Sequence, residues 1–213
     1  MRTMSGSLGT MKLGVIDYGA GNLGSLRNAF AKLHQEAICI KNPDEIHLYD
    51  KLILPGVGAF GDVRAIIRQK GFDEAITRYA ASGRYILGVC LGMQLLFGKS
   101  YEFGEHQGLG LIGGEIIHFA NAPRVPHIGW NRCFFTQEGA NHALLRDIDD
   151  GVFLYFVHSY HAHLCDESVA LSVCDYGDRF PAIVAKDNIL GIQPHPEKSH
   201  SAGLQILQNF LSM

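Results

Sequence analysis

The stretch over residues 84–97, RYILGVCLGMQLLF, constrains the fold of this chain more than any other. Residues 85–89 form an apolar run short enough for a buried strand, and residues 93–97 have the character of a helix. Cys90 lies at the junction, with Gly88 and Gly92 two residues to either side. This Gly-x-Cys-x-Gly pattern predicts a strained strand-to-helix turn, a nucleophile elbow, because a side chain at either glycine would strike the neighbouring backbone.

An elbow of this kind gives its central residue two chemical advantages. The side chain projects at the carboxyl end of a strand, and the N-terminus of the following helix stabilises a thiolate. The alternative is that Cys90 is a small buried hydrophobic residue, as most free cysteines are.

The rest of the chain alternates predicted strands and helices before its character changes. Strands are expected at residues 12–17, 38–40, 51–54 and 85–89, with helices near 26–33, 63–69 and 73–81. This alternation predicts right-handed crossovers and a parallel sheet. After residue 97, apolar runs separated by short turns predict antiparallel strands, either added to the parallel sheet or folded over it, at residues 114–119, 130–135, 152–158, 169–174 and 182–185. We therefore expect an α/β fold: an open, mostly parallel twisted sheet flanked by helices, with antiparallel strands added in the C-terminal half, a last strand at 189–193 and a closing helix at 201–211.

Length and composition favour one ordinary globular domain. The 213 residues are 47% hydrophobic and 18% charged, which is enough apolar material for a substantial core. We expect residues 11–213 to form this domain. Residues 1–10, MRTMSGSLGT, lack an apolar core and are expected to be a disordered extension.

The net charge, the apolar runs and the cysteines limit the possible binding partners and the cellular location of the protein. A net charge of −3 without a basic run argues against nucleic-acid binding. The absence of an apolar run of about 18 residues argues against a membrane span. Five cysteines, an odd number in scattered contexts, do not suggest a disulfide framework, so a reducing cytoplasm is expected.

Gly19, Gly21 and Gly24 raise a first rival interpretation, a dinucleotide site. They satisfy G-x-G-x-x-G between a strand and a helix. That fingerprint also needs an acidic residue at the end of the second strand, about 20 residues on, where this chain has Lys41 and Asn42. A lone glycine pattern is a weak signal.

A second rival is a metal site at His158, His161, His163 and Cys165. On a strand, residues 161, 163 and 165 would share one face, and His158 would point the other way. No second cluster completes a tetrahedral shell at familiar spacing, so partly exposed histidines at a strand end are the better interpretation. No metal and no cofactor are expected.

The third interpretation pairs Cys90 with His195 and Glu197. A cysteine nucleophile needs a base within hydrogen-bond reach and a third group that orients the base. His195 follows the last predicted strand between two prolines, which stiffen the segment, and Glu197 can return to the same side two residues later. If both strands are parallel, the thiol and the imidazole meet at one edge of the sheet.

Small residues after the third strand favour an oxyanion hole beside this edge. Gly56, Val57 and Gly58 can turn backbone N–H groups toward the space above Cys90. A plain strand-to-helix turn is the alternative.

Together these motifs resemble the class I (triad) glutamine amidotransferases. The resemblance rests on PGVGAF at 55–60, GVCLGMQLLF at 88–97 and GIQPHPEKS at 191–199. Within the family, DYGAGNLGS at 17–25, PHIGWN at 126–131 and YFVHSYH at 155–161 are most similar to the glutaminase subunits that serve a cyclase in histidine biosynthesis. The resemblance implies a flavodoxin-like fold and the hydrolysis of glutamine to glutamate and ammonia.

The resemblance also implies roles for individual residues. Cys90 would be the nucleophile, His195 the base and Glu197 its orienting group. The backbone N–H groups of Val57 and Leu91 would form the oxyanion hole. The implied glutamine-binding residues are Gly56, Gly58, Gln94, Ser159 and Tyr160.

A partner is implied as well. In the family's histidine branch the ammonia passes to a cyclase with a (β/α)8 barrel, so we expect a heterodimer with Asn22, Trp130, Asn131 and Lys198 facing that partner. Pro194 departs from the aromatic or aliphatic residue usual before the histidine, which puts the local strand pairing in question. The alternatives are a glutaminase subunit for another synthase, such as that of pyridoxal phosphate synthesis, and a non-catalytic nucleotide-binding module.

Overall fold

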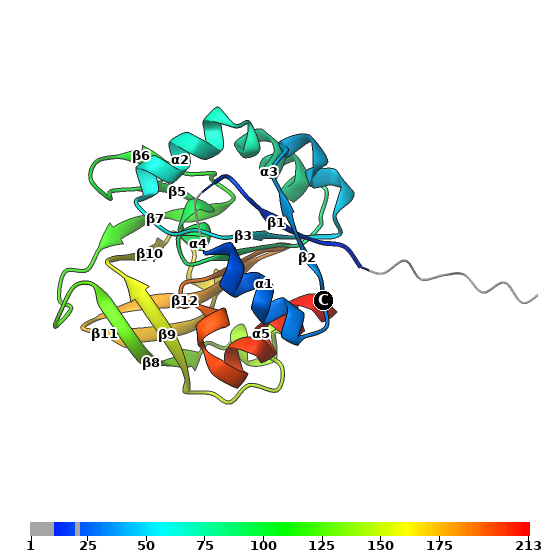
Figure 1. The fold of residues 1–213 in the computed structure, drawn as a ribbon. Helices are drawn as coiled ribbons and strands as arrows, with labels where there is room; N and C mark the ends of the chain where they lie inside the picture. The colour runs from blue at the N-terminus through cyan, green and yellow to red at the C-terminus, as the bar shows by residue number, and fades with distance from the viewer. Residues whose placement is uncertain (1–10, 20–21) are drawn as a thin grey trace, which may run out of the picture.

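The computed structural model describes residues 11–19 and 22–213, which form two sheets with helices against both faces of the larger one (Figure 1). The extension expected at residues 1–10 and the glycine at position 21 lie outside the described residues.

The larger sheet has nine strands in the described part of the chain. One half is parallel, in the order β2 (Ala37–Ile40), β1 (Leu13–Ile16), β3 (Lys51–Leu54), β4 (Ile86–Val89) and β13 (Ile189–Ile192). The other half continues antiparallel through β12 (Asp178–Lys186), β11 (Ala170–Tyr176), β8 (His127–Phe135) and β9 (Val152–His158). The predicted α/β sheet with antiparallel strands added in the C-terminal half is confirmed.

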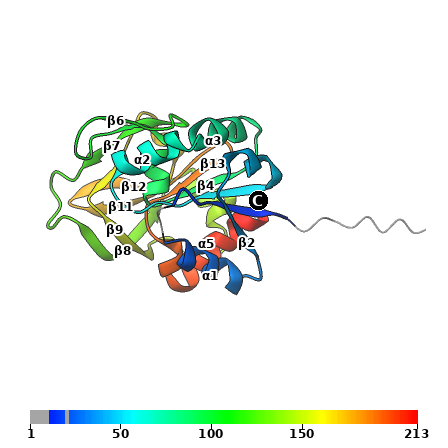
Figure 2. The same ribbon diagram turned by 45° about the horizontal axis from the view of Figure 1, so that its top comes forward.

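Helices cover both faces of the parallel half (Figure 2). On one side lie α2 (Phe60–Gln69) and α3 (Phe72–Ala81), and on the other lie α1 (Leu23–Lys32) and α5 (His200–Ser212). Each side has its own apolar core, with Phe60, Phe72 and Leu54 in one and Phe30, Phe210 and Ile53 in the other. Strands β1, β3, β4 and β13 are buried along their whole length, which explains their short continuous apolar runs.

A second sheet of four strands packs beside α2, in the order β10 (Tyr160–Leu164), β7 (Ile112–His118), β5 (Phe97–Ser100) and β6 (His106–Gln107). Its buried residues Ile112, Ile116 and Leu164 join the core that contains α2 and α3. Strand β9 runs directly into β10, so the turn at residue 159 connects the two sheets.

The helix expected over residues 93–97 begins and ends two residues earlier than predicted. Helix α4 spans Leu91–Leu95, and Phe97 already belongs to β5. The carbonyl oxygens of Leu95, Leu96 and Phe97 accept hydrogen bonds from the N–H groups of residues 109, 111 and 110 at 2.8–3.0 Å. These long-range partners replace the next helical turn. None of the described helices is long and apolar enough to cross a membrane.

Candidate active site

Cys90 occupies the turn between β4 and α4 with φ 54° and ψ −112°. A positive φ strains a residue that carries a Cβ. The flanking glycines allow the turn: a Cβ on Gly88 would lie 2.6 Å from the carbonyl oxygen of Gly92, and a Cβ on Gly92 would overlap the carbonyl oxygen of Leu54. The Cys90 N–H donates to the Ile192 carbonyl oxygen at 2.7 Å, which ties the turn to the end of β13. The strained turn that the sequence predicts is therefore present.

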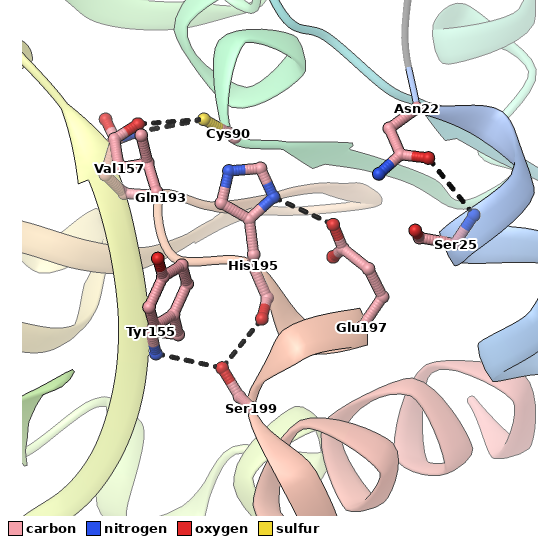
Figure 3. Close-up of polar contacts among 9 residues, drawn as sticks. All are labelled: Asn22, Ser25, Cys90, Tyr155, Val157, Gln193, His195, Glu197 and Ser199. Atoms are coloured by element: carbon pink, nitrogen blue, oxygen red, sulfur yellow. Dashed lines mark hydrogen bonds and ion pairs between the residues drawn. The ribbon is translucent and has the colours of Figure 1, made fainter. Parts of the chain in front are cut away.

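The Cys90 thiol is buried and has two polar neighbours besides the His195 ring. Its Sγ lies 3.9 Å from the carbonyl oxygen of Val157 and 3.8 Å from the side-chain Nε2 of Gln193 (Figure 3). The carbonyl can accept a hydrogen bond from the thiol, whereas the amide can donate one to the sulfur. Both the protonated and the ionised forms of Cys90 therefore have a partner.

The imidazole of His195 lies between the Cys90 thiol and the Glu197 carboxylate (Figure 3). Nδ1 donates to Glu197 Oε1 at 2.8 Å, and the two side chains are only 8% and 3% exposed. The ring nitrogen remote from Glu197 is left free for proton transfer. The structure thus brings together the three residues that the sequence pairs.

The charge state of His195 follows from these neighbours. Burial lowers the pKa of His195, but its hydrogen bonds to Cys90 and Glu197, with the charges of both groups, outweigh burial and raise the pKa from 6.5 to about 10. His195 is then protonated at neutral pH.

Pro194 does not disturb the strand pairing. Strand β13 ends at Ile192, after which the Gln193 N–H donates to the Ala182 carbonyl oxygen and the His195 N–H to the Tyr155 carbonyl oxygen, both at 2.8 Å. Pro194 falls between these two donors, where the sheet needs no N–H. The pairing question raised by the sequence is settled in favour of an intact ladder.

A cavity of about 340 Å³ opens above Cys90 and His195. Its lining comes from the loops that follow β1, β3, β4, β9 and β13 and from the small sheet. The predicted site residues in the lining are Asn22, Val57, Gly58, Leu91, Gln94, Ser159, Tyr160 and Lys198. Most of the site residues that were predicted from separate sequence motifs therefore lie around this one cavity.

Gly56 is the predicted pocket residue that does not line this cavity. It packs beneath the elbow, where an added Cβ would lie 2.6 Å from the backbone nitrogen of Gly92. Of the two predicted oxyanion donors, Val57 is 40% exposed at the rim, and Leu91 is the buried first residue of α4. Both line the cavity together with Cys90, and their oxyanion role stays a prediction.

Gln94 and Tyr160 form part of the cavity wall by contacting each other. The buried amide of Gln94 donates to the Tyr160 carbonyl oxygen at 2.9 Å and to Gln193 Oε1 at 3.0 Å. Since Gln193 also contacts the Cys90 sulfur, the side chains of Gln94 and Gln193 connect this wall to the thiol.

The four predicted partner-facing residues differ in their exposure and in their contacts within the chain. Asn22 caps α1 by accepting from the Ser25 N–H, and Lys198 lies exposed with its ammonium 5.7 Å from the Tyr155 ring. Trp130 is 43% exposed and stacks on the His200 ring at 4.8 Å. Asn131 is used within the chain, since its amide donates to the Asp175 carbonyl oxygen at 2.9 Å. Asn22 and Lys198 border the cavity, whereas Trp130 and Asn131 lie outside its lining.

Sequence reasoning missed several residues of the site. Glu102, Pro126, Val157 and His158 line the cavity, and Gln193 contacts the thiol. Gln193 and His158 lie within the matched segments at 191–199 and 155–161, so proximity to the motifs could have suggested them. Glu102 lies in an irregular loop between β5 and β6, and no pattern in the sequence marks it.

The metal interpretation finds no support in the described residues. His158 and His161 are buried among aromatic rings, while His163 and Cys165 are exposed. No group of three or more potential ligands in residues 11–19 and 22–213 is arranged to hold a metal ion. The glycine loop of the dinucleotide interpretation places Gly19 at φ 95° and Gly24 inside α1, and Asn22 between them borders the cavity.

Comparisons with known proteins agree on one family. The model of the class-I glutamine amidotransferase family matches residues 14–213. The chain is 52% identical to the imidazole glycerol phosphate synthase subunit HisH of Sulfurimonas denitrificans, over 93% of this chain and 96% of that one. It is 49% identical to the protein of the same name from Helicobacter hepaticus, over 95% and 99%.

Solved structures show the same fold at lower identity. A chain in the structure of PurLQS from Thermotoga maritima matches with a TM-score of 0.76 and 20% identity, covering 95% of this chain and 98% of that one. A structure described as a glutamine amidotransferase matches with a TM-score of 0.74 and 19% identity, covering 94% and 97%.

Proposed function

The chain belongs to the class I glutamine amidotransferase family, and we propose that it is the glutamine-hydrolysing subunit of an imidazole glycerol phosphate synthase. In this function it releases ammonia from glutamine for a cyclase subunit, which makes imidazole glycerol phosphate and aminoimidazole carboxamide ribotide in histidine biosynthesis. The observation that carries the proposal is the row of thiol, imidazole and carboxylate, in which the first two groups line the cavity and the third lies behind them. Relatives at 43–52% identity carry the name imidazole glycerol phosphate synthase subunit HisH, which favours this synthase over others that use glutamine.

In the proposed mechanism, the Cys90 thiolate attacks the side-chain amide carbon of glutamine. The carbonyl π electrons move to oxygen, which gives a tetrahedral oxyanion. His195, protonated at neutral pH, donates its proton to the amide nitrogen as the carbon–nitrogen bond breaks, and ammonia leaves. The product at this stage is a glutamyl thioester on Cys90.

Hydrolysis of the thioester uses the same residues in reverse. His195, now neutral, takes a proton from the attacking water, and the carbon–sulfur bond breaks to give glutamate and the thiolate. Throughout, Glu197 accepts from Nδ1 and keeps the opposite ring nitrogen directed at the reaction. The N–H groups of Val57 and Leu91 are the proposed donors to the oxyanion.

The cavity suggests how free glutamine is held. Glutamine carries an ammonium and a carboxylate on its α-carbon, which call for one negative partner and for N–H donors. Glu102 is the carboxylate in the lining, and one of its oxygens is occupied by the Phe60 N–H. We assign the other oxygen to the substrate ammonium. The segment at Ser159 and Tyr160, with Gly58 and Gln94, forms the remaining walls.

The proposed partner is a cyclase with a (β/α)8 barrel, bound in a heterodimer over the mouth of the cavity. Asn22 and Lys198 at this mouth, with exposed Trp130 nearby, would face it. All five cysteines are free, which fits the proposed cytoplasmic location.

The test is glutamate release by the complex with the cyclase and its ligand. Cys90→Ala should lower the rate by about 10³-fold or more, because it removes the nucleophile. Cys165→Ala, which removes an exposed thiol on the small-sheet side, should match the wild type. Activity retained in Cys90→Ala would overturn the mechanism.

Two further measurements separate the alternatives. A glutamine-analogue alkylator should label Cys90 and leave exposed Cys165 unlabelled, and free glutamine should protect Cys90. Copurification with a synthase other than the cyclase, such as the pyridoxal phosphate synthase, would change the assigned pathway. Saturable NAD binding together with an unreactive Cys90 would point to the nucleotide-binding module.

A further inference from the structure

Two buried histidines, His158 in the wall of the cavity and His127 behind it, face each other across β8 and β9. They are directly paired in the register of these antiparallel strands. His127 Nδ1 lies 3.0 Å from His158 Nε2, and His158 Nδ1 lies 2.8 Å from the carbonyl oxygen of Tyr160. His158 lines the cavity, and His127 does not.

The direction of each hydrogen bond follows from the last acceptor. A carbonyl oxygen can only accept, so His158 carries its proton on Nδ1 and donates to Tyr160. Because buried His158 is neutral, its Nε2 must accept, and His127 must donate from Nδ1. Nε2 of His127 is then the acceptor that faces the Asn131 amide at 3.5 Å. The four groups, from the Asn131 amide to the Tyr160 carbonyl oxygen, therefore form a chain of hydrogen bonds in which every donor points toward Tyr160. We call this chain the file.

The surroundings keep both rings neutral and fixed. His127 is stacked between Tyr176 at 3.9 Å and Phe156 at 4.8 Å. Burial lowers the pKa of His127 to about 4. Burial also lowers the pKa of His158 to about 3, although its hydrogen bond to Tyr160 acts in the opposite direction.

The file ends on an acceptor that the proposed glutamine pocket shares. The Tyr160 carbonyl oxygen also accepts from Gln94, so two donors from different elements fix it. His158 closes this contact over the turn at Ser159, which connects the two sheets and lines the cavity. The next member of the network, Gln193, contacts both Gln94 and the Cys90 sulfur. A change at His127 therefore reaches the pocket wall in two steps.

We propose that His127 and His158 are positioning residues for glutamine binding, acting by fixing the Ser159–Tyr160 turn of the pocket wall. The inference rests on the proposed glutaminase function. Neither ring is assigned a proton transfer in the reaction. Loss of the file should therefore weaken substrate binding while the chemistry at Cys90 continues.

The decisive experiment compares His127→Phe with His127→Asn in the complex with the cyclase. Phenylalanine keeps a ring between Tyr176 and Phe156 but cannot donate to His158. Asparagine loses the ring but places an N–H near the position of Nδ1. We expect KM for glutamine to rise about five- to tenfold in His127→Phe with kcat within about twofold, and His127→Asn to keep KM within about twofold.

A merely structural role gives the opposite order. Thermal unfolding of the free chain is measured in parallel, and His127→Asn is expected to be the less stable variant because it leaves a cavity. If the rise in KM follows the loss of stability, so that the asparagine variant binds glutamine worse, the inference is overturned. An increase in neither KM would also overturn it.

Matched variants guard against failure to fold. His161→Phe changes a buried histidine that, like His127, contacts the Phe119 and Phe180 rings. His161 does not line this cavity, so the KM of this variant should stay unchanged. His158→Asn, which retains a donor toward Tyr160, should have a lower KM than His158→Leu. Wild-type activity in the same assay tests the proposed function separately, so an inactive wild type and a wrong inference are distinguishable.

Discussion

The hydroxyl of Ser199 donates to the carbonyl oxygen of His195 at 2.7 Å and accepts from the N–H of Tyr155 at 3.0 Å (Figure 3). This side chain joins the segment after β13 to β9 directly behind the imidazole. Ser199 is buried, so water cannot replace either contact.

Ser199→Ala should lower kcat/KM for glutamine about tenfold, since the imidazole loses the backbone contact that orients it. Steady-state kinetics of the complex with the cyclase measure this. Ser172→Ala is the control, because the buried Ser172 hydroxyl has no partner among the described residues and its removal should not lower activity or stability. Equal kinetics for Ser199→Ala and the wild type would contradict the positioning role.

Gly92→Ala should prevent the elbow from forming. A methyl group there overlaps the carbonyl oxygen of Leu54, so the free energy of unfolding should drop by about 3 kcal/mol or more and Cys90 should lose its reactivity. Urea unfolding and alkylator labelling measure the two effects. Gly24→Ala offers the comparison, because α1 leaves open space at that position among the described residues. It should stabilise the chain by about 0.5–1 kcal/mol through helix propensity.

The pKa of His195 predicts how stability depends on pH. Since folding raises this pKa from 6.5 to about 10, the folded chain binds a proton that the unfolded chain releases in this window. The stabilisation from His195 is full below pH 6.5 and is lost as pH rises to about 10. Urea unfolding at pH 6, 8 and 10 should show a falling free energy for the wild type and a flatter profile for His195→Gln. A parallel decline in both would contradict the assignment.

Lys51→Met should destabilise the fold without affecting the cavity. The Lys51 ammonium donates to the carbonyl oxygens of Phe210 and Leu211 at 2.7 and 2.8 Å, at the end of α5. Methionine keeps the apolar stem but leaves these carbonyls without the charged donor, for an expected loss of about 1–3 kcal/mol. Chemical denaturation measures it, with exposed Lys41→Met as a control that should change little. Alkylation of Cys90 by the glutamine analogue should be unaltered.

Apart from the partly exposed edge strand β2, the parallel half of the fold could be predicted because its strands are buried along their whole length. Their short apolar runs leave no other placement, and Cys90, His195 and Glu197 follow two of them directly. The end of α4 could not be predicted in this way. Residues 93–97 are apolar enough for a helix, and only the hydrogen bonds from residues 109–111 end it.

The contacts behind the site depend on register, which the sequence does not specify. His127 meets His158 only because β8 and β9 pair with these residues opposite each other. In the sequence, the proximity of His158 to Cys165 suggests metal ligation, whereas in the fold His158 donates to the backbone carbonyl oxygen of Tyr160. The role of Glu102 could not be predicted for a related reason. Its position depends on where an irregular loop meets the start of α2.

Lys51 also marks where both ends of the described domain meet. Its backbone N–H bonds the Lys12 carbonyl oxygen, and its ammonium bonds that of Leu211. This is the amino end of β3, whereas the loop after the carboxyl end of β3 lines the cavity. A fluorophore or a surface tether attached beside Lys12 or Leu211 would therefore sit a full strand length from the substrate entrance, which leaves the mouth accessible for measurements of docking.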